Sequence, residues 1–176
     1  MKVVTPELAA LLAEYVRTHW TYNPETGVVS GRGGRPIGKK RKDGGLDCTV
    51  RFPDTGVVTA VLLHRAAWLL KTGEWPVVGI DHKDGDRSNN RWLNIRDATQ
   101  SQNRQNLKGV SAKGVLRGCT PYYRKWKAQI KAPDGKHHYL GLFPTQEEAH
   151  AAYCKAKLEL HPFQPVQRQP AEEQLW

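Results

Sequence analysis

The amino-acid sequence predicts an α+β protein of two successive modules, the second of them a three-stranded antiparallel sheet with one helix. Three observations predict this fold class. Apolar residues recur at helical spacing over 8–16, and they alternate with polar residues over 47–52 and 126–131. After Asn106 the chain becomes basic and glycine-punctuated, which separates the two patterns. The expected division is an N-terminal helix at 1–19, a first domain at 20–106, a second domain at 107–161 and a tail at 162–176.

The first helix is marked by signals at its N-terminus. Thr5 can cap it, Pro6 occupies its first position and Glu7 lies in its first turn. Leucines and other apolar residues then recur on one face, which is typical of a helix that packs on a core. With two Glu residues and no small-residue cleavage site, residues 1–16 are expected to form this amphipathic helix and not a signal peptide.

Strands and a second helix are expected next. The turn residues 23–27 separate two short apolar stretches and predict a hairpin. Residues 47–52 and 57–63 are expected to pair as strands around the turn 53–56. A short helix then follows over 64–71 and stops at Gly73.

Between the hairpin and these strands lies a glycine-rich loop, residues 31–45, with six cations. A charged loop of this kind is usually a solvated face, but its cations and backbone amides can also contact phosphates. The sequence leaves both interpretations open. The cations are Arg32, Arg35, Lys39, Lys40, Arg41 and Lys42.

The composition favours a polyanionic partner. The 27 Lys and Arg residues outnumber the 17 Asp and Glu residues and give a net charge of +10. No run of about 18 apolar residues occurs, so no membrane span is expected. Three widely spaced cysteines without a CxxC pair argue against a zinc ribbon and a disulfide framework, and we expect reduced thiols in a cytoplasmic protein.

The stretch from Ile80 to Asn106 carries the chemistry. Asp81 and His82 follow an apolar run, and a polar turn and a polar helical segment with Asn103 come after them. Carboxylate and amide oxygens favour Mg²⁺ or Mn²⁺ over zinc, and an imidazole that titrates near neutral pH suits the deprotonation of water. An EF-hand that began at Asp81 or Asp84 would need Glu at its twelfth position, where Trp92 and Ile95 stand, so the calcium-loop interpretation fails.

The order Asp81-His82, Asn94, Asn103 resembles the HNH endonucleases, in the phage and homing branch where the last His is replaced by Asn. The resemblance implies a ββα-metal core over 77–106 that holds one divalent ion, Mg²⁺ or Mn²⁺. Asp81 and Asn103 would be the metal ligands and His82 the general base. Asn94 would brace the loop and orient His82, while His64 would serve packing or lie behind the ligands.

The same resemblance implies a metal-dependent endonuclease for double-stranded DNA that is encoded by a phage or mobile element and acts in the host-cell cytoplasm. The chain would be a monomer or a homodimer. The alternative is a sequence-specific DNA-binding regulator with an inactive nuclease core. Because Asp81 and His82 are neighbours, a flat strand would point them to opposite faces, so we expect a bent strand or an ion at its edge.

The second module is expected to present a basic sheet face. Over 126–131, Trp126, Ala128 and Ile130 share one face, and Lys127, Gln129 and Lys131 share the other. Thr145 and Glu148 form a capping box that opens a helix ending near residue 161, which would cover the apolar face with Leu158 among its apolar residues.

Residues 108–160 resemble the plant-type ethylene-response-factor DNA-binding domain, with a longer first turn over 116–124. Residues 113–115 match its first strand, and residues 108–110 compete with them for that position. In that family the sheet reads the major groove of DNA. We therefore expect contacts to DNA from one set of side chains. They are Lys113, Arg117, Lys127, Gln129, Lys131, His137 and Tyr139.

Overall fold

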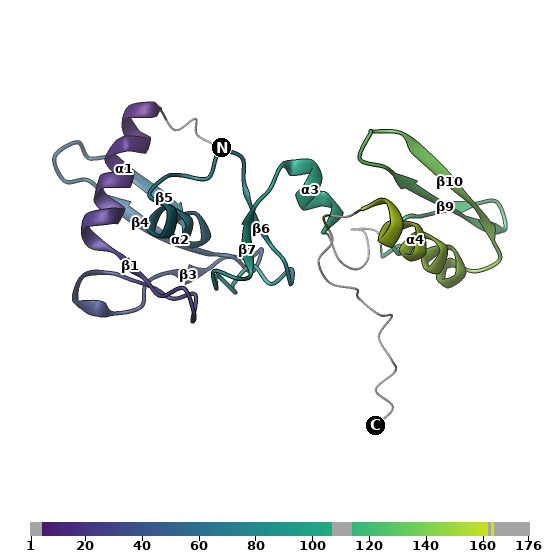
Figure 1. Ribbon diagram of the computed structural model, residues 1–176, viewed down its shortest axis with the longest axis horizontal. Coiled ribbons are helices and arrows are strands. Elements are labelled where there is room, and N and C mark those ends of the chain that lie inside the picture. Colours follow the sequence, from purple (N-terminus) through teal and green to yellow (C-terminus); the bar gives the residue numbers. More distant parts are fainter. Residues whose placement is uncertain (1–4, 107–113, 162, 164–176) are drawn as a thin grey trace, which may run out of the picture. The chain divides into compact units, whose positions relative to one another are not determined.

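The computed structural model describes residues 5–106, 114–161 and 163, and it confirms an α+β fold (Figure 1). The chain divides into two compact units, Met1–Gln100 and Ser101–Trp176. Among the described residues, no helix combines the length and the apolar character needed to cross a membrane. Lys113 and nearly all of the expected tail lie outside the described residues.

The first unit begins with the expected helix, α1 (Pro6–His19). The Thr5 hydroxyl accepts a hydrogen bond from the Leu8 amide at 3.3 Å, as its predicted capping role requires. The expected hairpin is β1 (Thr21–Tyr22) paired with β2 (Val29–Ser30). Helix α2 (Leu63–Thr72) ends where predicted, because Gly73 adopts the left-handed conformation of a helix C-cap, with φ of 87°.

The main sheet of this unit is antiparallel, in the order β3–β4–β5. Strands β4 (Leu46–Arg51) and β5 (Val58–Leu62) are the predicted pair. The loop 31–45 is more ordered than its composition indicates, since it contains the short 3₁₀ helix η1 (Arg32–Gly34) and the strand β3 (Lys39–Lys40). Strand β3 pairs with β4, with Lys39 opposite Asp47.

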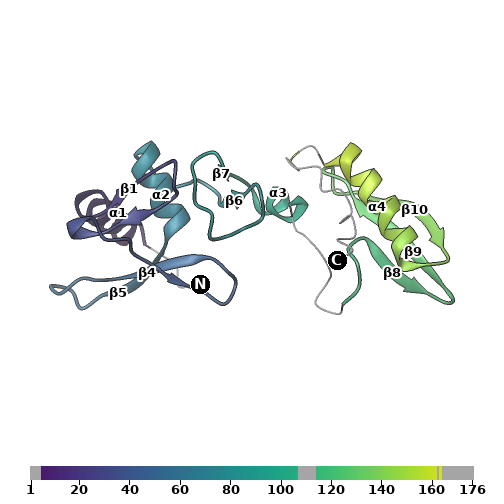
Figure 2. The ribbon, with the colours of Figure 1, turned by 90° about the horizontal axis from the view of Figure 1, so that it is seen from below.

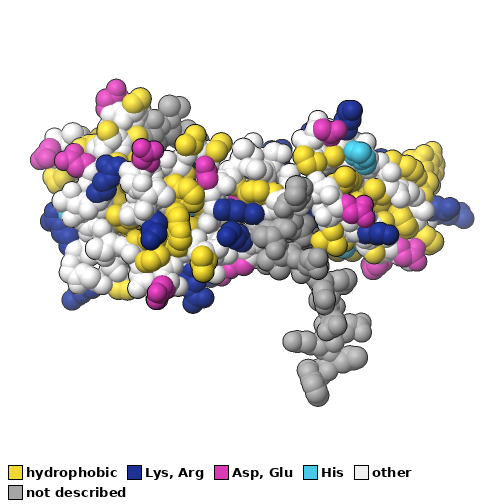
Figure 3. Space-filling view, viewed as in Figure 1, with side chains coloured by type: hydrophobic (Ala, Val, Ile, Leu, Met, Phe, Trp, Pro, Cys, Tyr) yellow, Lys and Arg dark blue, Asp and Glu magenta, His cyan; other side chains and the backbone are white. Residues whose placement is uncertain are grey.

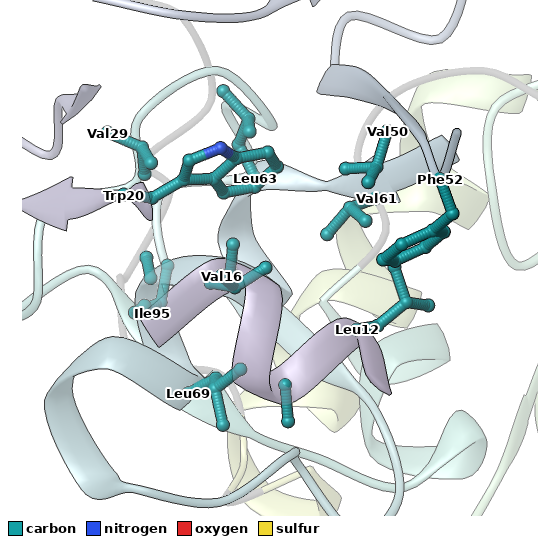
Figure 4. Packing of buried hydrophobic residues seen from close by; sticks show 13 residues of the cluster. Leu12, Val16, Trp20, Val29, Val50, Phe52, Val61, Leu63, Leu69 and Ile95 are labelled. Carbon is teal, nitrogen blue, oxygen red and sulfur yellow. The ribbon is translucent and has the colours of Figure 1, made fainter. Parts of the chain in front are cut away.

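Both helices lie on one side of the β4–β5 hairpin, and the core forms between them (Figures 1 and 2). Figure 4 shows Leu12 and Val16 of α1 facing Val50, Val61 and other apolar side chains across this space. The predicted apolar face of α1 is therefore the buried one. Burial of this set is the main favourable term for the unit, because each large apolar side chain contributes roughly 1.5–3 kcal/mol.

The stretch that carries the predicted site folds as two short strands and a helix. Strands β6 (Ile80–His82) and β7 (Ile95–Asp97) form an antiparallel pair joined by the loop 83–94. Helix α3 (Gln100–Gln105) follows, spans the sequence boundary between the two units and carries Asn103. This is the order of two strands and a helix that the resemblance implies over 77–106.

The second unit is the expected three-stranded antiparallel sheet, in the order β10–β9–β8. Its strands are β8 (Cys119–Tyr122), β9 (Lys125–Lys131) and β10 (His137–Phe143). Of the predicted first strand at 113–115, Gly114 and Val115 are not in a strand, and the alternative at 108–110 lies outside the described residues. The first described strand of this sheet is β8, inside the segment expected to be a turn. Pro121 fits there because β8 is an edge strand, where a missing backbone donor leaves no ladder bond unmade.

Helix α4 (Gln146–Leu160) covers one face of this sheet, as predicted. The Thr145 hydroxyl accepts a hydrogen bond from the Glu148 amide at 3.2 Å, as in the expected cap. Ala149 and Ala156 are buried against the sheet. Leu158, expected in this interface, is 53% exposed and is corrected to a surface residue.

Candidate functional site

Strands β6 and β7 position the predicted acid and base. Asp81 pairs with Arg96 and His82 with Ile95 in the strand register. Asp81 and His82 are nevertheless both buried, with 7% and 5% of their surfaces exposed. Adjacent residues on this short strand are thus both enclosed by the protein, one beside β7 and the other beside the loop 83–94.

His82 is held by an asparagine that the sequence analysis did not single out. The Nε2 atom of His82 lies 2.9 Å from the Oδ1 atom of Asn90, which is 1% exposed. Because an amide oxygen accepts hydrogen bonds, this arrangement places a proton on Nε2 and leaves the lone pair of a neutral ring on Nδ1. That tautomer suits a general base that acts through Nδ1.

The β1–β2 hairpin supports the segment that carries Asn90. The Tyr22 hydroxyl donates to the Asn90 carbonyl oxygen at 2.7 Å, and the Trp92 amide donates to the Pro24 carbonyl oxygen at 2.9 Å. A Cβ atom on Gly27 would lie 2.5 Å from the Arg91 amide nitrogen, so the two backbones meet where only glycine fits. Burial raises the pKa of Tyr22 to about 12, which keeps its hydroxyl a donor at neutral pH.

Asn94 braces the turn that follows the base. Its Oδ1 atom accepts from the Asp84 amide at 3.1 Å, and its Nδ2 atom donates to Asp84 Oδ1 at 3.0 Å and to the Asn89 carbonyl oxygen at 2.7 Å. Burial alone would raise the pKa of Asp84, but hydrogen bonds from Asn89, the Asp86 amide and Asn94 outweigh it and lower the pKa. The carboxylate is therefore ionised and structural.

The structure divides the role proposed for Asn94 between two asparagines. Asn94 fixes the turn through Asp84 and Asn89, whereas Asn90 Oδ1 accepts the hydrogen bond that His82 Nε2 donates. The run Ser88-Asn89-Asn90 signals only a turn in the sequence. Nothing local distinguishes Asn90, because its position at His82 depends on the hairpin that is far away in sequence.

Asp81 is paired with a cation from the neighbouring strand. The Nε and Nη2 atoms of Arg96 both donate to Asp81 Oδ2, at 3.0 and 2.8 Å. The pair is largely sheltered from solvent, so screening weakens it less than a surface pair. Arg96 fixes the orientation of the carboxylate and compensates its charge within the strand pair.

The ring of His64 packs against the ring of His82, the predicted base. Its ring and that of His82 meet edge to face, with centroids 5.2 Å apart. Burial first, and then the charge of His82, lower the pKa of His64 to about 3, so this imidazole is neutral at physiological pH. The packing role expected for His64 agrees with this position.

The turn of the β3–β4 hairpin lies close to this site. Asp43 accepts from Arg87 at 3.1 Å and is 3.3 Å from Arg41, which joins the basic loop to the turn after β6. Arg41 and Arg87 are also near enough to lower the pKa of His64. These exposed pairs contribute little stability, but they hold two guanidinium groups near His64, whose ring contacts that of His82.

The oxygen donors suit a sparse ion site. Among the described residues, no three His, Cys, Asp or Glu side chains gather as a metal centre. Mg²⁺ keeps several waters and needs only one or two protein groups, so a carboxylate such as Asp81 with an amide oxygen fits it. Asn103 belongs to the second unit, and its pairing with Asp81 stays a prediction.

The residues predicted to contact DNA gather on the sheet face opposite α4. Cross-strand partners in an antiparallel sheet share a face. Gln129 pairs with Tyr139 and Lys131 with His137, and Lys127 lies on the same face of β9. Thr120, Tyr122, Lys125 and Leu142 lie on the same face by this register. We call the surface formed by all of these residues the open sheet face.

Arg117 precedes β8, and its carbonyl oxygen accepts from His150 Nδ1 at 2.8 Å, which fixes its backbone against α4. Lys113 lies outside the described residues. Charge is distributed unevenly over this unit. Acidic side chains lie among Lys and Arg on the side drawn in Figure 3, whereas residues 117–131, which include β8 and β9, contain no Asp or Glu.

Comparison with known proteins found similarity to one nuclease family and to one solved structure. Residues 61–105, from β5 to α3, match the family model described as HNH endonuclease. A solved structure described as "DNA binding and cleavage by the HNH homing endonuclease I-HmuI" is 23% identical, with a TM-score of 0.42, and the match covers 74% of this chain and 75% of that chain. No curated protein matches the chain. Residues 61–105 are therefore similar to an HNH endonuclease segment.

Proposed function

We propose that this HNH endonuclease hydrolyses phosphodiester bonds of double-stranded DNA with one divalent ion, Mg²⁺ or Mn²⁺. The observation that carries the proposal is the contact between His82 Nε2 and Asn90 Oδ1, next to the oriented carboxylate of Asp81. A base held in one tautomer beside a hard oxygen ligand matches the requirements of metal-assisted phosphodiester hydrolysis.

His82 is the proposed general base. Its Nδ1 lone pair would take a proton from the water that attacks phosphorus, while Nε2 keeps its hydrogen bond to Asn90. Asn94 holds the turn 84–89 and so limits movement of the segment between the base and Asn90. Because the imidazole ring of His82 is already fixed, it loses little conformational entropy when it reaches the reactive geometry.

Asp81 and Asn103 are the proposed ligands of the divalent ion. When bound, the ion would stabilise the negative charge on the departing oxygen. Two hydrogen bonds from Arg96 to one oxygen of Asp81 hold the carboxylate in its orientation. Oxygen ligands of this kind favour Mg²⁺ or Mn²⁺ over Zn²⁺.

DNA would be held by two groups of cations. Arg41 and Arg87 lie beside the site and can neutralise phosphates next to the bond that is cleaved. The second unit would act as an ethylene-response-factor-like DNA-binding domain through its open sheet face, where Gln129 and Lys131 can reach base edges and phosphates. We further propose a phage or mobile-element origin and action in the host-cell cytoplasm.

Cleavage of supercoiled plasmid tests the function. The wild-type protein should convert the plasmid to nicked or linear DNA in Mg²⁺, and His82→Ala should lose this activity while it keeps DNA affinity. Exposed His138, in the second unit, provides the matched control, and His138→Ala should cut normally. Plasmid cleavage by His82→Ala at the wild-type rate would refute the mechanism.

Metal dependence is tested in the same assay. EDTA should stop cleavage, and Mg²⁺ or Mn²⁺ should restore it because the proposed ligands are oxygens. Restoration by Zn²⁺ alone would contradict the ligand assignment. DNA binding without any cleavage in all three metals would favour the alternative, a DNA-binding regulator with an inactive core.

A further inference from the structure

Two tyrosines lie at the tip of the sheet in the second unit. Tyr122 ends β8, and Tyr123 begins the two-residue turn that leads into β9. Tyr122 is 47% exposed and Tyr123 is 93% exposed. Their ring centroids are 5.0 Å apart, with the ring planes at 84°. The chain therefore holds an aromatic pair in solvent at one end of the open sheet face.

The backbone conformation of Tyr123 is unfavourable for a tyrosine. Tyr123 has φ of 51°, and among the described residues it is the non-glycine residue with positive φ. Glycine adopts this conformation freely, and asparagine tolerates it, but a bulky side chain is strained there. A ring that is almost fully exposed gains little packing energy to offset this strain. Tyr123 therefore destabilises the fold, and its packing does not offset this strain.

The surroundings of the two rings point to the kind of partner. Arg124 completes the turn, and Lys125 lies opposite Tyr122 in the strand register. Residues 117–131 contain no Asp or Glu. The two rings are continuous with the open sheet face. Tyr122 and Thr120 are alternate residues of β8 and share that face with their partners Lys125 and Lys127. Cations beside an exposed aromatic ring match a polymer that offers both phosphates and flat bases.

We propose that Tyr123, supported edge-on by Tyr122, is a base-stacking contact for DNA bound on the open sheet face. This inference rests on the proposed function in that it takes DNA as the partner of the sheet. Arg124 and Lys125 would neutralise the phosphates that flank the stacked base. A base inside a regular duplex has no free face, so the contact requires local unstacking of one base step, as apolar wedges achieve in other DNA-binding proteins.

The test compares Tyr123→Gly with the wild type in the full-length chain. Glycine fits a φ of 51° without strain, so the variant should unfold at the same or a higher denaturant concentration. Its affinity for duplex DNA should nevertheless fall roughly tenfold, the lower part of the range that loss of one stacked base gives. Tyr123→Phe keeps the aromatic face and should bind like the wild type.

Fluorescence of 2-aminopurine, placed at several positions of the duplex and measured in EDTA, reports the unstacking directly. The wild type should raise the fluorescence at one position, and Tyr123→Gly should not. Unchanged affinity and fluorescence in Tyr123→Gly would overturn the proposal, as would a wild-type protein that does not bind DNA. If these effects occur but the wild type fails to cleave plasmid, the stacking contact stands and only the proposed catalysis fails.

Discussion

The Oδ1 atom of Asn90 lies 2.9 Å from the Nε2 atom of His82, and both side chains are buried. This contact decides which nitrogen of the ring carries a proton, and therefore which nitrogen is left to accept one. It also makes Asn90 a positioning residue, because it acts on the reaction only through His82.

Replacement of Asn90 by Ala should lower kcat for plasmid cleavage by about 10–100-fold, the usual effect of losing a residue that orients a group at a metal site. KM should change little, since Asn90 is too deeply buried to meet DNA. In Asn90→Asp, the carboxylate would favour the protonated ring, so the acid limb of the pH–rate profile should move to higher pH. A profile identical to that of the wild type would contradict the positioning role.

The pair formed by Asp81 and Arg96 should behave as a coupled unit. Arg96→Gln leaves a buried carboxylate without its cation and should lower the free energy of unfolding by about 3 kcal/mol. When Arg96→Gln is introduced into the Asp81→Asn variant, it should lower the free energy of unfolding clearly less. Urea denaturation of the two single variants and the double variant should give a coupling energy of about 1–3 kcal/mol. Additive losses from the two substitutions would show that the contact is energetically irrelevant.

The clamp between Asn94 and Asp84 should make stability depend on pH. Hydrogen bonds lower the pKa of Asp84 in the folded state. The ionised carboxylate therefore stabilises the fold at pH values above the ordinary aspartate pKa, and this stabilisation is lost as the pH falls through the pKa of the folded state. Asn94→Ala should therefore cost about 1–2 kcal/mol at pH 7 and less at pH 3. Denaturation at both pH values measures this, and an equal or larger cost at low pH would argue against the clamp.

The open sheet face should make an electrostatic contribution to DNA binding. Lys131→Ala should weaken binding and reduce the slope of log Kd against log salt by about one ion, because one phosphate contact is lost. Lys155 lies exposed on α4, away from this face, and Lys155→Ala is the matched control. Equal salt slopes for the two variants would place the proposed face away from the DNA.

Gly118 should tolerate no side chain, because a Cβ atom there would lie 2.1 Å from the Tyr153 ring and φ is 80°. Gly135→Ala is the matched control, since Gly135 has φ of 86° but no neighbour within 4 Å. Alanine should cost about 1 kcal/mol at Gly135 from backbone strain and at least 2 kcal/mol more at Gly118. Thermal denaturation of both variants measures the difference, and equal costs would mean that Tyr153 moves aside freely.

Elements with strong local signals were predictable from the sequence. The Thr5 cap, the stop at Gly73 and the alternation over 126–131 depend on residues close together in the chain, so each could be assigned without knowledge of the rest. Asp81 and His82 could also be singled out locally, because they are adjacent after an apolar run, and their roles as metal ligand and base stay predictions.

Elements defined by distant partners were missed. Strand β3 consists of two lysines, and only its pairing with β4 makes it a strand. Strand β8 is only four residues long, contains Pro121 and shows no apolar alternation, and its register comes from β9. Asn90 resembles any turn asparagine until the first hairpin brings it to His82.

The hydrogen bond from the Tyr22 hydroxyl to the Asn90 carbonyl joins residues 68 positions apart, and that from Trp75 to the Ala9 carbonyl joins residues 66 apart. Contacts of such separation form late, because the entropy of closing the intervening loop is lost before they stabilise the chain. During synthesis the N-terminal hairpin must therefore wait for the loop 83–94 to emerge. A fragment that starts at residue 61 keeps the whole HNH segment but lacks the hairpin on which Asn90 rests, so it should fold into an incomplete site.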